Sequence, residues 1–150
     1  ILSKQEVYIM NDFDEINKLF IEISNTCFEK YLKPQIIHIE LGKIELKMSV
    51  LAEHSNVVGR VHGGVFASFA DIAMGAACWT HGKKAVTSDM NLTFIRNVSV
   101  VDEIYATATV ISNGRQLMRT RCEIRGSDSK LLVSATGTYF VLSETEKSFF

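Results

Sequence analysis

The sequence predicts a single α+β domain spanning residues 1–150, in which one antiparallel sheet packs around a long buried helix. The first observation is that residues 60–80 are almost entirely apolar or small and carry one carboxylate, Asp71, near their middle. A helix that is apolar on every side is buried on every side. The second observation is that the flanking segments alternate apolar and polar residues, as half-buried strands do. Together they predict a core over about residues 36–142, preceded by a separate N-terminal helix.

The segment 60–80 is also long enough to be considered as a membrane-spanning helix. Three glycines, the central carboxylate and the lack of a second hydrophobic span argue against that interpretation. We therefore expect no membrane span, and a helix that is enclosed by the protein's own sheet.

An amphipathic helix is predicted over residues 12–31. Its apolar side chains recur three and four positions apart, which places them on one face, and Asp12 with Glu15 fits a capping box. Pro34 then ends the helical segment. The predicted buried face consists of Phe13, Ile16, Phe20, Ile23 and Cys27.

Two strands are expected before the buried helix and four after it. Because short connections join antiparallel neighbours, we expect one antiparallel sheet in which tight turns join the last four strands. Asn113-Gly114 is the strongest of these turn signals. The alternating segments lie at about residues 37–41, 44–50, 86–94, 103–112, 115–125 and 130–142.

Composition excludes several classes of protein. A net charge of −1 leaves no electrostatic footprint for nucleic acid, so no nucleic-acid partner is expected. The three cysteines have no paired spacing, which predicts free and mostly buried thiols in a reducing compartment, the cytoplasm. No cluster of Cys and His has the spacing of a metal site, and the first residues lack the layout of a signal peptide.

One motif resembles a known family. His62-Gly63-Gly64 opens the buried helix, with Asn56 six residues before the histidine and Asp71 nine residues after it. Together with the strand residues 89–94, this motif is similar to acyl-CoA thioesterases of the phenylacetic-acid-degradation (PaaI-like) type, which have the hotdog fold. The similarity extends over about residues 36–142.

The resemblance implies a curved antiparallel sheet wrapped around the central helix and hydrolysis of an acyl-CoA thioester to free acid and CoA. It implies no cofactor, since coenzyme A is part of the substrate, and a homodimer as the minimal active unit, commonly paired into a homotetramer. Two positions depart from the family pattern. Arg60 stands where an uncharged residue is common, and Thr87, next to Ser88, stands where some relatives have a serine of the catalytic site.

The start of the helix and its carboxylate suit thioester chemistry. A helix N-terminus offers unpaired N–H groups and partial positive charge, and glycine lets a carbonyl oxygen approach the backbone. Gly63 and Gly64 are therefore candidate oxyanion donors, with close packing as the structural alternative. Asp71 is the candidate general base for water, or the nucleophile itself. Its structural alternative is a carboxylate that bonds to a neighbouring strand.

The spacing of these groups favours a site shared between two chains. Gly63 and Asp71 are eight residues apart, which corresponds to about 12 Å of rise along a helix. One chain cannot bring both groups to the same carbonyl. We therefore expect two equivalent sites at a twofold interface.

Other polar residues are weaker candidates. Asn56 would hold the water or the thioester, or only its own loop. His62 would orient the loop or contact substrate, and Thr87 would bond to the water of Asp71 or act as an ordinary strand residue. His54 is predicted to be structural.

The phosphates of coenzyme A need cationic partners. Arg96 and Arg115 are the first candidates, and Lys83 and Lys84 the weaker ones. Two rival functions stay open: a hotdog hydratase or dehydratase, and a non-catalytic acyl-CoA-binding module. The second could dispense with Asp71.

Overall fold

The structure is a computed structural model that describes residues 4–144, with side chains at residue 14 and residues 16–142. Its elements follow the predicted order of one helix, two strands, a buried helix and four strands. They are α1 (Lys4–Thr26), η1 (Phe28–Tyr31), β1 (Gln35–Glu40), β2 (Lys43–Ser49), η2 (Ala52–His54), α2 (Gly63–Trp79), β3 (Lys83–Phe94), β4 (Glu103–Asn113), β5 (Leu117–Gly126) and β6 (Leu131–Glu144).

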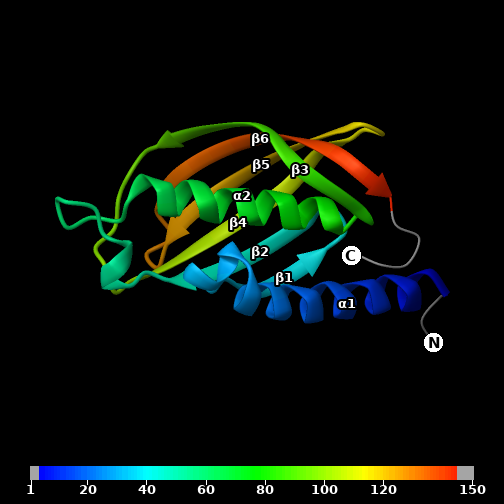
Figure 1. The fold of residues 1–150 in the computed structure, drawn as a ribbon, viewed down its shortest axis with the longest axis horizontal. Helices are drawn as coiled ribbons and strands as arrows, with labels where there is room; N and C mark the ends of the chain where they lie inside the picture. Colours follow the sequence, from blue (N-terminus) through cyan, green and yellow to red (C-terminus); the bar gives the residue numbers. More distant parts are fainter. Residues whose placement is uncertain (1–3, 145–150) are drawn as a thin grey trace.

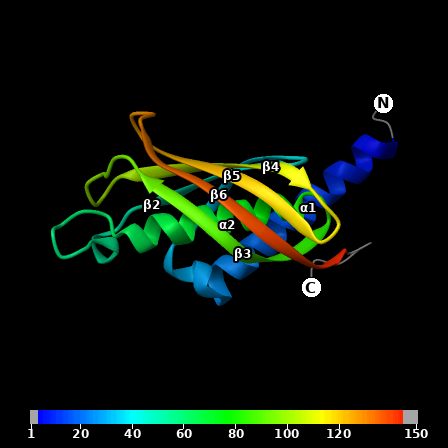
Figure 2. The same cartoon turned by 90° about the horizontal axis from the view of Figure 1, so that it is seen from above.

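The strands form one antiparallel sheet of six in the order β1-β2-β4-β5-β6-β3. Figure 1 shows this sheet curving around α2, with α1 beside β1. Seen from above, the strands cross over α2 (Figure 2). This is the α+β hotdog architecture that the sequence predicted.

The connection between β3 and β4 corrects one prediction. β3 pairs with β6 and not with β4, so residues 95–102 carry the chain across the sheet instead of forming a tight turn. The Asn97 side chain fastens this crossing to the start of α2 through two hydrogen bonds with the Val61 backbone, of 3.2 and 2.9 Å. The crossing leaves β3 at one edge of the sheet.

The core lies between α2 and the concave face of the sheet. Along β2 and β5 every second side chain is buried, as the alternation predicted. α2 has buried residues on several faces, which explains its apolar sequence. These residues are Phe66, Phe69, Ala70, Ala73, Met74, Ala76, Ala77 and Cys78.

Gly137 in β6 is required by close packing against α2. A Cβ atom there would lie 2.8 Å from the Tyr139 ring and 3.2 Å from the methyl carbon of Met74. We expect Gly137→Ala to lower the free energy of unfolding by about 1–3 kcal/mol, because both neighbours are buried. Urea unfolding measures this loss. Ser134→Ala on the exposed face of the same strand is the control, and an equal effect of both variants would contradict the packing argument.

The N-terminal helix differs from its prediction at both ends. α1 begins at Lys4, so Asp12 lies inside the helix and the predicted capping box is wrong. α1 ends at Thr26, and Cys27 follows in an extended conformation with an exposed side chain instead of continuing the buried face. The side chains of Asp12, Phe13 and Glu15 lie outside the described residues. The remaining members of the face, Ile16, Phe20 and Ile23, are buried as predicted.

The other two cysteines, Cys78 and Cys122, are free and buried. Burial raises the pKa of each thiol to about 12, so both stay protonated at neutral pH. Within residues 4–144, no helix combines the length and hydrophobicity needed to cross a membrane.

Candidate active site

Asp71 is half-buried near the middle of α2, where it meets β3 and β6. The Thr87 hydroxyl donates to Asp71 Oδ1 at 2.6 Å, and the Tyr139 hydroxyl donates to the same oxygen at 2.7 Å. The Tyr139 hydroxyl also lies 3.1 Å from the Asp71 carbonyl oxygen. Among the described residues, no side chain or backbone group donates to Oδ2. Asp71 is therefore held through one carboxylate oxygen, and its other oxygen, Oδ2, has no hydrogen-bond partner among the described residues.

Tyr139 is the site residue that the sequence did not reveal. Its side chain is 1% exposed. Burial and the nearby Asp71 carboxylate raise the pKa of the Tyr139 phenol above its usual range, so the hydroxyl stays protonated and donates. A buried tyrosine needs a partner for its hydroxyl, but the alternation along β6 gives no indication of which residue that is.

The sheet register brings Thr87 to Asp71. Thr87 lies directly opposite Tyr139 in the β3–β6 pair, and the register shifts between Thr87 and Asp89. The shift places an extra residue, Ser88, in β3, as a β-bulge does. Of the two adjacent hydroxyl residues, Thr87 is therefore the one that bonds to Asp71.

The N-terminus of α2 is capped by its own histidine. The Gly64 N–H donates to His62 Nδ1 at 2.8 Å, and a Cβ atom on residue 64 would lie 2.9 Å from that nitrogen. Glycine at this position thus makes room for the cap. The cap occupies the Gly64 amide, so a carbonyl could bind there only after the imidazole turns away. The Gly63 amide makes no hydrogen bond within the part of the chain that the structure describes, and it stays the candidate oxyanion donor.

Asn56 organises the loop before α2. Its Oδ1 accepts from the Val58 and Arg60 N–H groups, both at 3.0 Å. The Arg60 guanidinium donates to Ser99 Oγ at 3.2 Å, which ties this loop to the crossing segment. The local role is therefore present, and a contact with substrate stays a prediction.

His54 has a structural environment, as predicted. The residue is 8% exposed, its Nδ1 accepts from the Leu51 N–H at 3.0 Å, and its Nε2 lies 3.0 Å from the Tyr31 carbonyl oxygen. The Nε2–H tautomer satisfies both contacts. His54 thereby joins η2 to η1.

The candidate phosphate-binding residues do not gather at one place. Lys83 is 8% exposed, and its ammonium donates to Asn113 Oδ1 at 2.7 Å and to the Gly114 carbonyl oxygen at 3.0 Å. Its interior position disfavours the predicted phosphate contact. Lys84, the next residue, lies at the same end of β3 and is half-buried.

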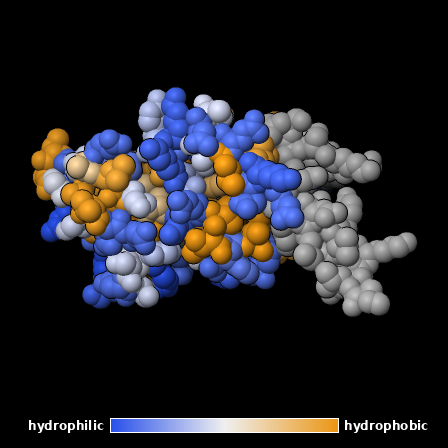
Figure 3. Space-filling model, turned by 90° about the horizontal axis from the view of Figure 1, so that it is seen from below, coloured by the Kyte–Doolittle hydropathy of each residue, from blue (hydrophilic) through white to orange (hydrophobic). Residues whose placement is uncertain are grey.

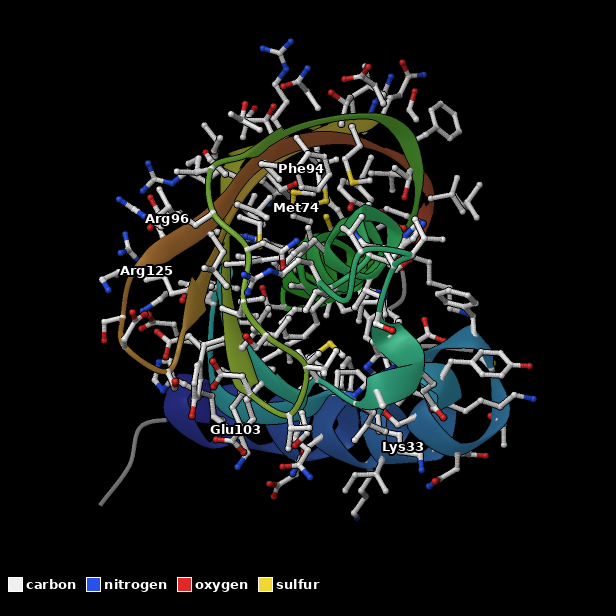
Figure 4. The ribbon with its side chains drawn as sticks, turned by 90° about the vertical axis from the view of Figure 1, so that its left-hand side faces the viewer. Lys33, Met74, Phe94, Arg96, Glu103 and Arg125 are labelled. Atoms are coloured by element: carbon white, nitrogen blue, oxygen red, sulfur yellow. The ribbon has the colours of Figure 1, made fainter. Side chains whose placement is uncertain are left out.

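Arg96 and Arg115 lie at opposite ends of β6. The Arg96 guanidinium donates to the Leu131 carbonyl, whereas Gln116, next to Arg115, accepts from the Val141 N–H. Ten strand residues separate those two points, which is roughly 33 Å. The two arginines of one chain are thus too far apart to hold the same phosphate. Figure 4, which looks along α2, shows Arg96 and Arg125 pointing away from the core at one end.

The two groups proposed to act on the carbonyl are also apart within one chain. Asp71 bonds to Thr87, whereas Gly63 lies beside Phe94, whose ring would be 3.6 Å from a Cβ atom on that glycine. Seven residues of β3 separate these two contacts. The structure thus keeps the two groups apart within one chain, and completion of the site by a second chain stays a prediction. Within the described residues, no group of three or more His, Cys, Asp or Glu side chains could hold a metal ion.

A curved six-stranded sheet around a central helix, with a glycine pair at the helix start and a carboxylate at its middle, defines a hotdog enzyme fold. The chain belongs to the thioesterase superfamily, whose family model matches residues 58–133. The protein is therefore a thioesterase.

Several known proteins resemble this chain. Human acyl-coenzyme A thioesterase 13 is 30% identical over 110 residues, which cover 71% of this chain and 79% of that protein. The acyl-coenzyme A thioesterase PaaI of Escherichia coli is 35% identical over 92 residues, covering 61% of this chain and 66% of PaaI. The solved PaaI structure superposes with a TM-score of 0.81 and 28% identity, over 89% of this chain and 95% of PaaI. A Streptococcus mutans protein solved with acetyl-CoA shares the fold, with a TM-score of 0.73 and 19% identity over 75% of this chain and 91% of that one.

Proposed function

We propose that this thioesterase hydrolyses acyl-CoA thioesters. In this proposal, Asp71 Oδ2 is the atom that activates a water molecule or attacks the thioester carbonyl carbon. The observation that carries the proposal is the pair of hydroxyl donors on Asp71 Oδ1, at 2.6 and 2.7 Å. They hold the carboxylate in one orientation, with the second oxygen unbound among the described residues. The printed functions of human acyl-coenzyme A thioesterase 13 and of PaaI support the substrate class.

The chemistry needs an activated nucleophile and a polarised carbonyl. In one route, Asp71 Oδ2 takes a proton from a water molecule as the water oxygen attacks the carbonyl carbon, and this proton later goes to the thiolate of CoA. In the other route, Oδ2 attacks the carbonyl carbon itself and forms a mixed anhydride, which water then hydrolyses to the free acid while restoring Asp71 and supplying the proton that the thiolate takes up. The Gly63 N–H at the α2 N-terminus stabilises the charge that develops on the carbonyl oxygen. The carbon–sulfur bond breaks, and the thiolate of CoA leaves and takes up a proton.

The free edge of β3 supports a dimer that completes this site. Along β3, Thr87 lies next to Asp71, and Phe94 lies next to Gly63. If two β3 strands pair antiparallel about a point between residues 90 and 91, Thr87 of one protomer lies opposite the partner's Phe94. That register would bring Asp71 close to the partner's Gly63. Proteins rarely leave the outer edge of an edge strand of this length exposed.

Exposed apolar side chains near the same end agree with burial by a partner. Val57 and Val58, in the loop before α2, are 104% and 74% exposed, and Phe94 is 55% exposed. Figure 3 shows apolar surface at the end of the molecule where this loop lies. We further propose that two such dimers pair into a tetramer. We also propose a cytoplasmic location, which is in keeping with the buried free thiols.

For the phosphates of CoA we retain Arg96 as the candidate, because it lies near the start of α2 where the carbonyl would bind.

The experiment that tests the function is a hydrolysis screen of acetyl-, hexanoyl-, decanoyl- and benzoyl-CoA, with release of free thiol as the readout. Thiol release from at least one ester at catalytic rates is expected. No release from any of them would reject acyl-CoA as the substrate class.

The two hydroxyl groups give a separate prediction about Asp71. Thr87→Val and Tyr139→Phe are each expected to lower kcat by about tenfold, because each removes one hydrogen bond to a charged group. KM should change little, since neither hydroxyl bonds to the substrate in this proposal. Thr87→Ser keeps the hydroxyl and should retain most of the activity. Full activity of Thr87→Val would show that the orientation of Asp71 does not depend on Thr87.

A further inference from the structure

A pocket of about 440 Å³ opens beside Asp71, between α2, β3 and the C-terminal part of α1. Its size lies within the range of small-molecule sites. Figure 1 shows α2 between β3 and α1. Apart from the polar site residues, the lining is mostly apolar and includes Phe20, Ile23, Ile72, Trp79 and Val86.

Gly75 lines this pocket at a place where the protein itself does not require glycine. It lies inside α2, where glycine costs about 1 kcal/mol relative to alanine. Its backbone conformation is not left-handed, and a Cβ atom there would meet only Tyr139, at an ordinary 3.6 Å. This contrasts with Gly137, where the same atom would be 2.8 Å from Tyr139. Because Gly75 has no side chain, the part of the pocket next to it stays open.

The pocket has a measurable length along α2. From Asp71 to Trp79 the helix rises about 12 Å. Trp79 contacts Phe20 edge-on, with ring centroids 6.5 Å apart, so these two aromatic side chains mark the far end. An extended chain advances about 1.2 Å per bond, and the distance therefore accommodates roughly ten carbon atoms.

The charges around the pocket restrict the chemistry of its occupant. Asp71 and Glu29 both line it, whereas no Lys or Arg does so among the described residues. A second carboxylate on the acyl group would lie near these like charges, which is unfavourable. An uncharged hydrocarbon chain meets no such penalty.

We propose that this pocket binds the acyl group and selects uncharged, medium-length chains of up to about ten carbons, with Gly75 as the residue that admits them. The proposal rests on the acyl-CoA thioesterase function proposed above. The thioester lies at Asp71, and the chain runs along α2 over Gly75 toward Trp79, with α1 as the outer wall. An acetyl group ends before it reaches Gly75.

The test compares wild type with Gly75→Ala and Gly75→Leu on acetyl-, hexanoyl- and decanoyl-CoA. Gly75→Ala is expected to lower kcat/KM for decanoyl-CoA by about tenfold, and Gly75→Leu by more, with acetyl-CoA little affected. Hexanoyl-CoA should be preferred over adipyl-CoA, which has the same chain length and a terminal carboxylate. Thermal unfolding should show that Gly75→Ala is at least as stable as wild type, which excludes loss of folding as the cause.

Two results would overturn the proposal. One is an equal loss for acetyl- and decanoyl-CoA, or no loss for either. The other is a weaker dimer of Gly75→Ala in sedimentation, because the glycine would then serve contact between protomers.

A binding measurement separates this proposal from the proposed function. In the Asp71→Asn background, calorimetry should show that decanoyl-CoA binds more tightly than CoA, and that Gly75→Leu removes the difference. If wild type hydrolyses none of the esters but this pattern is seen, the pocket assignment stands and the catalytic assignment fails. Equal affinity for CoA and decanoyl-CoA rejects the pocket.

Discussion

Replacing Asp71 by asparagine is expected to lower acyl-CoA turnover by at least about a hundredfold, the contribution of a positioned general base. Asparagine has nearly the same shape, and its amide oxygen can still accept from Thr87 and Tyr139. Folding should therefore be retained, and circular dichroism with a thermal scan checks this. Initial rates of thiol release across the acyl-CoA series measure the effect.

Asp14→Asn provides the matched control for this experiment. Asp14 is exposed on α1, lies neither on β3 nor in the lining of the pocket beside Asp71, and removing its charge should leave turnover within about twofold of wild type. Near-normal turnover by Asp71→Asn would reject Asp71 as base or nucleophile. Equal losses in both variants would instead indicate a general effect of charge.

The sequence predicted the fold because its strongest patterns come from burial. The apolar segment around α2 and the alternation in β2 and β5 follow directly from which side chains the core encloses. The positions where α1 begins and ends were harder to predict from the sequence. The helix spans Lys4–Thr26 with Asp12 inside it, so the capping pattern at Asp12 does not mark its start.

The candidate site was only partly predictable for a related reason. Asp71 is conspicuous because it is a carboxylate in an apolar helix, and the glycine pair is conspicuous beside it. Tyr139 lies 68 residues away and reaches Asp71 only because β6 pairs with β3, a pairing that requires the crossing through residues 95–102. Such long-range pairing leaves no local pattern in the sequence.

Adjacent residues of the same type also have different environments in the structure. Gly63 and Gly64 were predicted to act together, but the His62 cap occupies only the second amide. Lys83 and Lys84 were both named as weaker candidates for the phosphates, but the Lys83 ammonium donates to Asn113 Oδ1 and to the Gly114 carbonyl oxygen. Composition and motifs cannot distinguish two adjacent residues of the same type. Their roles differ because the folded chain gives each of them different hydrogen-bond partners.

The proposed shared site predicts that two inactive variants restore activity when mixed. Gly63→Pro removes one amide donor at the first position of α2, where proline is well tolerated in a helix. The preceding residue, His62, already has the extended conformation that proline favours, with ψ of 136°. Asp71→Asn removes the carboxylate. In each homodimer both sites are then damaged.

A mixed dimer would have one site with both lesions and one site with neither. After subunit exchange between equal amounts of Gly63→Pro and Asp71→Asn, half of the dimers are mixed, and about a quarter of wild-type activity should appear. Each variant alone, taken through the same exchange, should stay inactive. If exchange is verified by mass spectrometry and no activity returns, the carboxylate and the amide act within one chain. That result would contradict the twofold site, because the 12 Å rise between Gly63 and Asp71, about the length of two helical turns, would then have to be bridged by a single protomer.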